Sequence, residues 1–237
     1  DERNPNIQNI EYLKKMFRQK AVDEISENIV YPLKRTSPIP SVENAEELKK
    51  RFDSIFDEDL IRIITSSDID QWSEMGWRGI MLDDGILWMD YDGKITAVNY
   101  QSKYEKKLAK KLTSKIKGDL SSDLRHNFKG EVYKFKTKNY FIRIDELKNG
   151  MYRYACWKKE NPESTKPDLV LENGKIEFSG SGGNHVITFK NNIYEYKVFH
   201  NKIAASGIAD ITLVVEKNGK EILSEDGKLE YDITQTD

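Results

Sequence analysis

The spacing of apolar residues changes along the chain, and this change limits the possible folds more than any other property. Between residues 7 and 28 apolar residues recur every three or four positions, which places them on one face of a helix. After about residue 75 apolar and polar residues alternate, as they do in half-buried strands. The pattern predicts an α+β domain, with helices and then an antiparallel meander, followed by an all-β antiparallel sandwich or barrel.

In the first half, we expect one long helix over residues 7–28 and an extended segment at Ile29–Leu33, where Pro32 prevents simple continuation. Asn44, with Glu47 three residues later, resembles a capping box, and Asp57 is expected to cap a further short helix. Strands are predicted at residues 79–82, 86–89 and 94–98, joined by the hairpin pairs Asp84-Gly85 and Asp92-Gly93.

A lysine-rich helix is predicted over residues 103–117, and the polar stretch 118–127 that follows is typical of a domain boundary. The expected domains are therefore residues 1–118 and 128–237. The second should contain about seven to nine short strands. The turn pairs expected between its strands are Asn149-Gly150, Asn173-Gly174, Asn218-Gly219 and Asp226-Gly227.

The composition excludes several classes of protein. The 237 residues are 38% hydrophobic and 33% charged with a mean hydropathy of -0.71, which is typical of a folded and very soluble chain. A net charge of -2 gives no overall attraction to nucleic acid or to an anionic membrane. No apolar run approaches the length of a transmembrane segment. Cys156 is the only cysteine, so neither an intramolecular disulfide nor a Cys-based zinc site can form.

The chain begins at Asp1 without a methionine or an apolar leader. We interpret it as the mature form of an exported bacterial protein whose leader has been removed, located in the periplasm or at the cell surface. A lipid anchor upstream of Asp1 is compatible with this interpretation. The lack of disulfides fits a cytoplasmic protein as well as an exported one.

Three short segments of the first half resemble uncharacterised exported bacterial proteins with NTF2-like or cystatin-like folds. They are Tyr31-Pro-Leu33, Phe52 with Ile55-Phe-Asp-Glu-Asp-Leu60, and Gly79-Ile-Met-Leu-Asp-Asp-Gly-Ile-Leu-Trp88. The resemblance implies a curved sheet wrapped by helices and a cavity, and it implies no particular activity. The second half more faintly resembles β domains of secreted bacterial proteins such as lysozyme-inhibitor barrels, which usually carry a disulfide that this chain lacks.

The first candidate site is a cluster of aromatic residues around the first hairpin. Trp72, Trp77, Arg78 and Trp88 fall close together in the sequence. Flat indole faces beside a guanidinium can stack on a sugar ring, a peptide or a partner surface. The alternative is that these tryptophans are core residues, because alternation buries one face of a strand.

The second candidate is a glycine-rich loop made of Ser181, Gly182, Gly183, Asn184 and His185. Its backbone N–H groups could hold an anion, with hydrogen bonds added by Asn184 and His185. The spacing matches neither a dinucleotide fingerprint nor a P-loop. The simpler interpretation is a glycine-rich connection between two strands.

Other motifs favour structural roles. The three histidines, His126, His185 and His200, show no local metal-ligand spacing, so we expect no metal and no cofactor. Cys156 is predicted to be a small core residue. The lysines of the helix over residues 103–117 are interpreted as a solvated face, and Asp90-Tyr-Asp92-Gly93 as a turn.

We therefore expect a non-catalytic binding or interaction module for an unknown protein, peptide or glycan, with no nucleic-acid partner. The first alternative is an inhibitor or immunity-type protein that blocks a cell-wall or toxin hydrolase through a protruding loop, either residues 158–166 or the glycine-rich loop. The second is a small-molecule enzyme that uses Asp68 or Asp70 as a base in an NTF2-like cavity.

Overall fold

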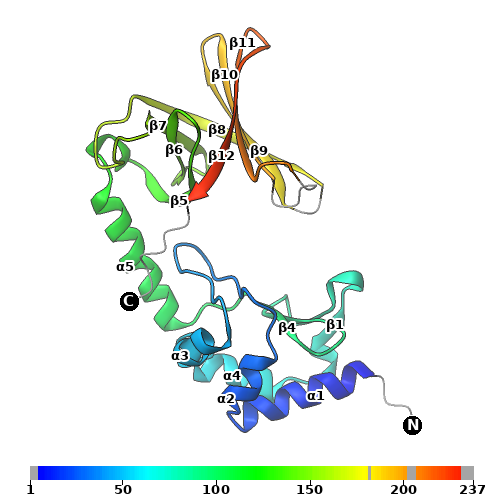
Figure 1. Cartoon of the computed structure of the whole chain (residues 1–237). Helices are drawn as coiled ribbons and strands as arrows, with labels where there is room; N and C mark the ends of the chain where they lie inside the picture. Colours follow the sequence, from blue (N-terminus) through cyan, green and yellow to red (C-terminus); the bar gives the residue numbers. More distant parts are fainter. Residues whose placement is uncertain (1–4, 181–182, 202–206, 231–237) are drawn as a thin grey trace. The chain divides into compact units, whose positions relative to one another are not determined.

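The chain divides into two units, residues 1–112 and 113–237 (Figure 1). The computed structural model describes residues 5–180, 183–201 and 207–230. Each unit has its own cluster of buried apolar side chains, one formed by residues between Ile10 and Val98 and the other by residues between Phe135 and Val215. The first unit is α+β and the second is all-β, so the predicted fold class is confirmed.

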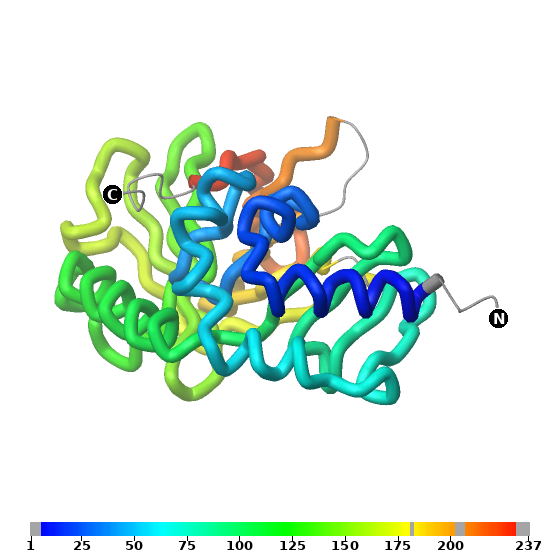
Figure 2. The backbone as a smooth tube through the Cα atoms, turned by 90° about the horizontal axis from the view of Figure 1, so that it is seen from below, coloured from blue at the N-terminus to red at the C-terminus, as the bar shows by residue number. Residues whose placement is uncertain are grey.

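The helices that precede the sheet of the first unit are α1 (Pro5–Arg18), α2 (Val22–Glu27), α3 (Ala45–Ile55) and α4 (Glu58–Ser66). Figure 2 shows α1, in dark blue, extending away from the other helices of this unit toward the N-terminus. The prediction of one helix over residues 7–28 is wrong, because the chain leaves the helix at Lys20, which has a φ of 49°. The predicted extended segment is confirmed, since Ile29 bridges to Ile95 and Leu33 to Val42.

Both predicted helix caps are present. The side chain of Asn44 accepts a hydrogen bond from the backbone N–H of Glu47 at 3.0 Å, and Asp57 accepts one from Leu60 at 3.0 Å. The carboxylate of Glu47 accepts the N–H of Glu43 at 2.8 Å, one residue before the cap. These bonds satisfy N–H groups that a helix start otherwise leaves without a partner.

The sheet of the first unit is an antiparallel meander in the order β1-β2-β3-β4. Its strands are β1 (Trp72–Glu74), β2 (Ile80–Leu82), β3 (Leu87–Met89) and β4 (Ile95–Val98). The prediction found the last three and missed β1. Ile80, Leu82, Leu87 and Met89 are all buried together with side chains of α1, α3 and α4, so the inner face of this sheet is filled by core residues.

The second unit is a closed antiparallel barrel in the order β10-β11-β12-β5-β6-β7-β8-β9. The barrel itself follows α5 (Lys103–Asp119) and the short turn η3 (Ser122–Leu124). Its strands are β5 (Phe128–Lys136), β6 (Tyr140–Leu147), β7 (Tyr152–Lys158), β8 (Leu169–Ser179), β9 (Asn184–Asn191), β10 (Tyr194–His200), β11 (Ile211–Lys217) and β12 (Lys220–Glu230).

Two of the predicted turn pairs lie inside strands. Asn173-Gly174 is part of β8 and Asp226-Gly227 is part of β12, so the prediction of turns there is wrong. In the ladder between β7 and β8, Tyr154 pairs with Leu171 and Tyr152 pairs with Gly174. The register therefore shifts between these two pairs, which marks an irregularity of the ladder next to Asn173-Gly174. Each of these strands is consequently longer than the sequence pattern predicted.

The barrel has apolar side chains on both faces of β6 and β7. Ile142, Ile144 and Tyr154 point into the interior cluster, and Phe141 and Trp157 point to the outer face. There they are covered by three apolar residues of the segment that leads into the barrel. Leu120 comes directly after α5, Leu124 ends η3, and Phe128 begins β5. Among the described residues, no helix is both long and apolar enough to cross a bilayer.

Candidate functional site

The outer face of the four-stranded sheet carries the central residue of the aromatic cluster. Trp88 in β3 lies opposite Met81 in β2 and Ala97 in β4. All three are half-buried, whereas the neighbours of Met81 and Trp88 along β2 and β3 point into the core and are fully buried. Alternation along the strands therefore places a tryptophan on the face of the sheet that the core does not fill.

A short turn brings two further residues of the cluster beside this face. η2 (Gly76–Arg78) is closed by hydrogen bonds from the N–H of Met75 to the carbonyl of Gly79 at 2.8 Å and from the Tyr91 hydroxyl to the carbonyl of Gly76 at 2.8 Å. Trp77, at the middle of η2, has 84% of its surface exposed. The turn thus holds an indole in solvent on a fixed backbone.

The guanidinium of Arg78 lies over the indole of Trp88, with Cζ 5.7 Å from the ring centroid. Gly85 packs on the same indole, since a Cβ there would lie 2.9 Å from its Nε1. A cation over a tryptophan ring is an attractive arrangement worth about 0.5–1 kcal/mol at an exposed site. Both contacts restrict the orientation of Trp88.

Trp72 occupies a different environment. It is only 8% exposed, and its Nε1 donates a hydrogen bond to the hydroxyl of Ser67 at 2.9 Å. The structure therefore brings Arg78 onto Trp88, with Trp77 next to Arg78 in η2, and places Trp72 in the core of the first unit. We name Trp77, Arg78 and Trp88 the tryptophan–arginine surface.

The turn at Asp90-Tyr-Asp92-Gly93 borders this surface. One carboxylate oxygen of Asp90 accepts the N–H groups of Asp92 and Lys94 at 3.0 and 2.9 Å. The predicted turn is therefore confirmed, and the Asp90 side chain is used within it.

The second candidate, the glycine-rich loop, is described only in part, because Ser181 and Gly182 lie outside the described residues. The carbonyl of Gly183 accepts a hydrogen bond from Nδ1 of His185 at 2.9 Å. Asn184 begins β9, and the ring of His185 lies close to those of Tyr133 and His200. The histidine thus belongs to a cluster inside the barrel, which the sequence pattern did not predict.

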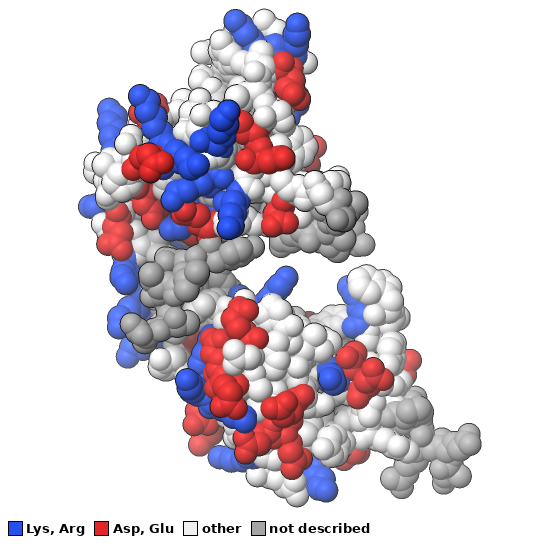
Figure 3. Space-filling view, in the orientation of Figure 1, with Lys and Arg blue, Asp and Glu red and all other residues white. Residues whose placement is uncertain are grey.

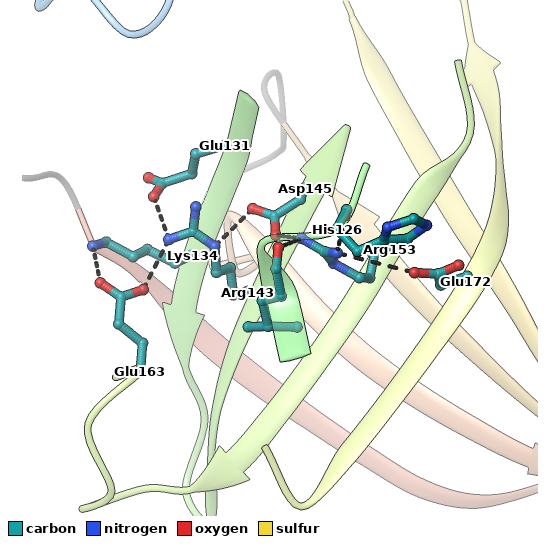
Figure 4. A network of polar contacts seen from close by, with 9 residues as sticks. His126, Glu131, Lys134, Arg143, Asp145, Arg153, Glu163 and Glu172 are labelled. Atoms are coloured by element: carbon teal, nitrogen blue, oxygen red, sulfur yellow. Dashed lines mark hydrogen bonds and ion pairs between the residues drawn. The ribbon is translucent and has the colours of Figure 1, made fainter. Parts of the chain in front are cut away.

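A buried network of charges lies on the outer face of β6 and β7 (Figure 4). Asp145 accepts from Nε of Arg143 at 2.6 Å and from Nη2 of Arg153 at 2.9 Å. All three side chains are at most 1% exposed. Arg153 also donates to the carbonyls of Leu124 and His126, which fastens the segment before β5 to the barrel.

The same network reaches the loop between β7 and β8. Glu163 accepts from Arg143 at 2.8 Å and from Lys134 at 3.2 Å. Burial acts to raise the pKa of the Glu163 carboxyl, but the two cations outweigh this effect and hold the pKa below its usual value. Glu131, on the other side of Arg143, has a pKa raised by burial, which Arg143 opposes. The loop proposed as protruding is therefore held to the barrel at Glu163.

The sequence analysis did not predict this network, because it took the polar residues that alternate with apolar ones along a strand to face solvent. A signal was available, because Arg143, Asp145 and Arg153 share their strand face with the apolar residues Phe141 and Trp157. Charged residues of both signs among large apolar ones indicate a covered face with internal ion pairs.

The first unit also has an open cleft of about 450 Å³ on its helical side. It is lined by Tyr12, Met16, Asp23, Glu24, Glu27, Asn28 and Lys49. Lys49 is paired with Asp23 at 3.0 Å and with Glu46 at 2.9 Å. Acidic side chains gather on the viewed side of this unit, the lower one in Figure 3.

The remaining candidates occupy ordinary positions. Asp68 and Asp70 are both exposed, and neither lines the cleft. Asp68 begins η1 (Ile69–Gln71), where its N–H donates to the side chain of Gln71 at 2.8 Å. Cys156 is buried in the barrel core, as predicted, and burial raises the pKa of its thiol to about 11. The lysines of α5 are exposed except Lys117, which is half-buried.

Comparison with known proteins gives no relative for this chain: no protein family, no curated protein and no solved structure matches it. Within the described residues, no group of three or more His, Cys, Asp and Glu side chains is arranged to hold a metal ion.

Proposed function

We propose that this chain is a non-catalytic binding protein that acts outside the cytoplasm and contacts a protein, peptide or glycan through the tryptophan–arginine surface. The observation that carries the proposal is the 84% exposure of Trp77 in a hydrogen-bonded turn beside the Arg78–Trp88 stack. Tryptophan and arginine are the residues most enriched among those that dominate binding energy.

The fixed geometry of this surface supports the proposal. Gly79 has a φ of 91°, and a Cβ at this position would lie 2.3 Å from the carbonyl oxygen of Met89, so the backbone after η2 requires glycine. A rigid aromatic side chain loses little conformational entropy when a ligand binds. An exposed indole can stack on the apolar face of a sugar ring or on a peptide side chain.

The enzyme alternative is less well supported by the structure. A catalytic base is expected inside a cleft, but Asp68 and Asp70 are exposed and outside the cleft of the first unit. The buried carboxylate Asp145 is bonded to two arginines on the outer face of the barrel. The predicted base, Asp68 or Asp70, therefore does not lie beside that cleft.

The test is a binding screen of the full chain against chitohexaose, soluble peptidoglycan fragments and a random peptide library, followed by tryptophan fluorescence. We expect a ligand whose affinity falls roughly tenfold or more in Trp77→Ala, because a central aromatic anchor contributes at least that much. Arg78→Ala should weaken the binding of the same ligand. The far-UV circular dichroism spectrum should be unchanged in both variants.

Tyr104→Ala is the matched control, because Tyr104 is another exposed aromatic residue, 58% exposed, on α5. It should bind like the unmodified chain. Full affinity in both Trp77→Ala and Arg78→Ala would reject the tryptophan–arginine surface as the binding site.

A second candidate function, inhibition of a cell-wall or toxin hydrolase, is favoured by one observation. Phe178, at the end of β8 just before the glycine-rich loop, is 66% exposed. An exposed apolar side chain near the end of a strand is suited to contact with a partner protein. Inhibition of a muramidase by the full chain, lost in Phe178→Ala and retained in Trp77→Ala, would favour this function over the first.

We also propose that the first unit is related to NTF2-like or cystatin-like domains, supported by helices that share a core with an antiparallel meander. The extracytoplasmic location is part of the proposal as well. It is consistent with a single buried cysteine, on which an oxidising compartment has little effect. Fractionation of cells that produce the full-length protein tests the location directly.

A further inference from the structure

The rings of Tyr133, His185 and His200 meet inside the barrel, and the exposed ring of Phe178 packs against that of His185. Phe178, His185 and His200 are direct cross-strand partners on β8, β9 and β10. Tyr133 of β5 reaches them from another part of the barrel wall, with its ring centroid 5.1 Å from that of His200 and 6.0 Å from that of His185. Because β5 is not adjacent to β9 or β10, these contacts cross the barrel interior.

The two histidines lie close enough to act together. Their ring centroids are 5.1 Å apart, and the rings meet edge to face at 85°. Two nitrogens that bind one ion at about 2.0–2.1 Å each are separated by at most about 4.2 Å. Each ring nitrogen lies off its centroid, so a centroid distance of 5.1 Å is compatible with this limit after a small rotation of the side chains.

The hydrogen bonds of His185 prepare one nitrogen as a ligand. Its Nδ1 lies 2.9 Å from the carbonyl oxygen of Gly183, which can only accept, so Nδ1 carries the proton. Its Nε2 then has a free electron pair and lies 3.4 Å from the hydroxyl oxygen of Tyr133. A histidine that donates one N–H to a backbone carbonyl while the other nitrogen binds a metal is a common arrangement in metal sites.

We propose that His185 and His200 bind a late first-row divalent transition ion, such as Cu²⁺, Ni²⁺ or Zn²⁺, inside the barrel, with the Tyr133 oxygen in position to be a third ligand. Imidazole nitrogen suits these ions, whereas Mg²⁺ and Ca²⁺ require oxygen ligands. The histidines are half-buried, so an ion can reach them. The site is independent of the tryptophan–arginine surface, which lies in the other unit.

The first experiment measures binding of Ni²⁺, Zn²⁺ and Cu²⁺ to the full chain by calorimetry in a non-coordinating buffer. We expect one ion per chain, with affinity lowered roughly tenfold or more in His185→Phe and in His200→Phe, since loss of even an outer partner costs 10- to 100-fold. Phenylalanine keeps an aromatic ring at each position, and circular dichroism reports whether the barrel remains folded.

The chain provides a matched control, because its third histidine, His126, is exposed and lies before β5. His126→Phe should bind the ions like the unmodified chain. The proposal is overturned if no ion binds at millimolar concentration, if binding persists in the double variant His185→Phe/His200→Phe, or if His126→Phe removes it.

A second measurement identifies the ligands directly. The electron paramagnetic resonance spectrum of the Cu²⁺-loaded chain should show hyperfine coupling to two nitrogens, reduced to one in either single histidine variant. Tyr133→Phe should keep both nitrogens and lose a phenolate-to-copper absorption band. If the unmodified chain has no such band, Tyr133 is not a ligand, and if its spectrum shows a single nitrogen, the two-histidine site is rejected.

Discussion

At Gly174 the backbone of β8 passes directly against the buried ring of Phe189. A Cβ at this position would lie 2.2 Å from Cε1 of Phe189, far inside van der Waals contact. Gly227 in β12 is similar, since its Cβ would lie 2.7 Å from Cδ2 of Phe135. Both rings are fully buried in the barrel core, so these glycines make room for large core side chains.

Replacement of Gly174 by alanine should therefore destabilise the barrel. Phe189 is enclosed and cannot move freely, so overpacking should cost about 1–3 kcal/mol in the free energy of unfolding. Gly130→Ala is the matched control, because Gly130 also lies in a strand and nothing is within 4 Å of its Cβ position. Urea unfolding should show a change of less than about 0.5 kcal/mol for the control. Equal effects in the two variants would contradict the packing argument.

The same residue shows a limit of prediction from sequence. Asn-Gly correctly predicts the tight connection at Asn218-Gly219, where both residues have a positive φ, but at Asn173-Gly174 it marks an irregularity inside β8. Asn173 also has a positive φ of 61°, so the local conformational preference is satisfied in both places. What differs is the approach of Phe189, a contact made through the folded barrel, which the local sequence does not specify.

At the scale of secondary-structure elements, β6 and β7 are organised by the charges on their outer face. Arg143, Asp145 and Arg153 are buried there, and their hydrogen bonds reach the segment before β5 and the loop after β7. An ion pair removed from water stabilises a fold only when its members are well satisfied by partners. The network therefore fastens two irregular segments to a regular sheet.

Glu163→Gln tests this role through its pH dependence. The pKa of Glu163 lies below its usual value of 4.5, so its charge stabilises the folded chain above that pH, and the stabilisation is lost as pH falls through the folded-state pKa. At pH 7 the free energy of unfolding of the unmodified chain should exceed that of Glu163→Gln by about 1–3 kcal/mol. This difference should shrink below pH 4.5. Denaturant unfolding at a series of pH values measures it.

Glu160→Gln is the control for this experiment, because Glu160 is in the same loop but is exposed. Its stability should match that of the unmodified chain to within about 0.5 kcal/mol at each pH. A difference between Glu163→Gln and the unmodified chain that is constant from pH 7 to pH 3 would show that charge is not the cause.

The elements that carry the candidate sites were unequally predictable. Trp77, Arg78 and Trp88 are close in sequence and joined by one meander, so their grouping followed from the hairpin pattern. His185 and His200 are brought together by the β9–β10 register, and Tyr133 by closure of the barrel. Local spacing contains no information about such contacts, which is why the histidines appeared isolated along the chain.

At the scale of the whole molecule, α5 connects two separate cores. Near its start, Glu105 forms a buried pair with Arg35, whose Nε donates to it at 2.8 Å. After its end, Leu124 and Phe128 are buried on the outer face of the barrel. The change of hydrophobic period predicted both an α+β part and a β part, and the structure confirms these two architectures. The sequence alone did not predict the buried ion pair between Glu105 and Arg35.

Separate cores predict separate responses to core mutations. Leu13→Ala removes a fully buried side chain from the first core and Ile187→Ala does so in the second, each at a cost of about 2–5 kcal/mol. Hydrogen exchange followed by mass spectrometry should show faster exchange in α1–β4 for Leu13→Ala and in β5–β12 for Ile187→Ala. Leu13 belongs only to the first cluster and Ile187 only to the second. The second unit should therefore keep its protection from exchange in Leu13→Ala, and the first unit should keep its protection in Ile187→Ala. An equal loss of protection in both units, in either variant, would mean that the two cores unfold as one.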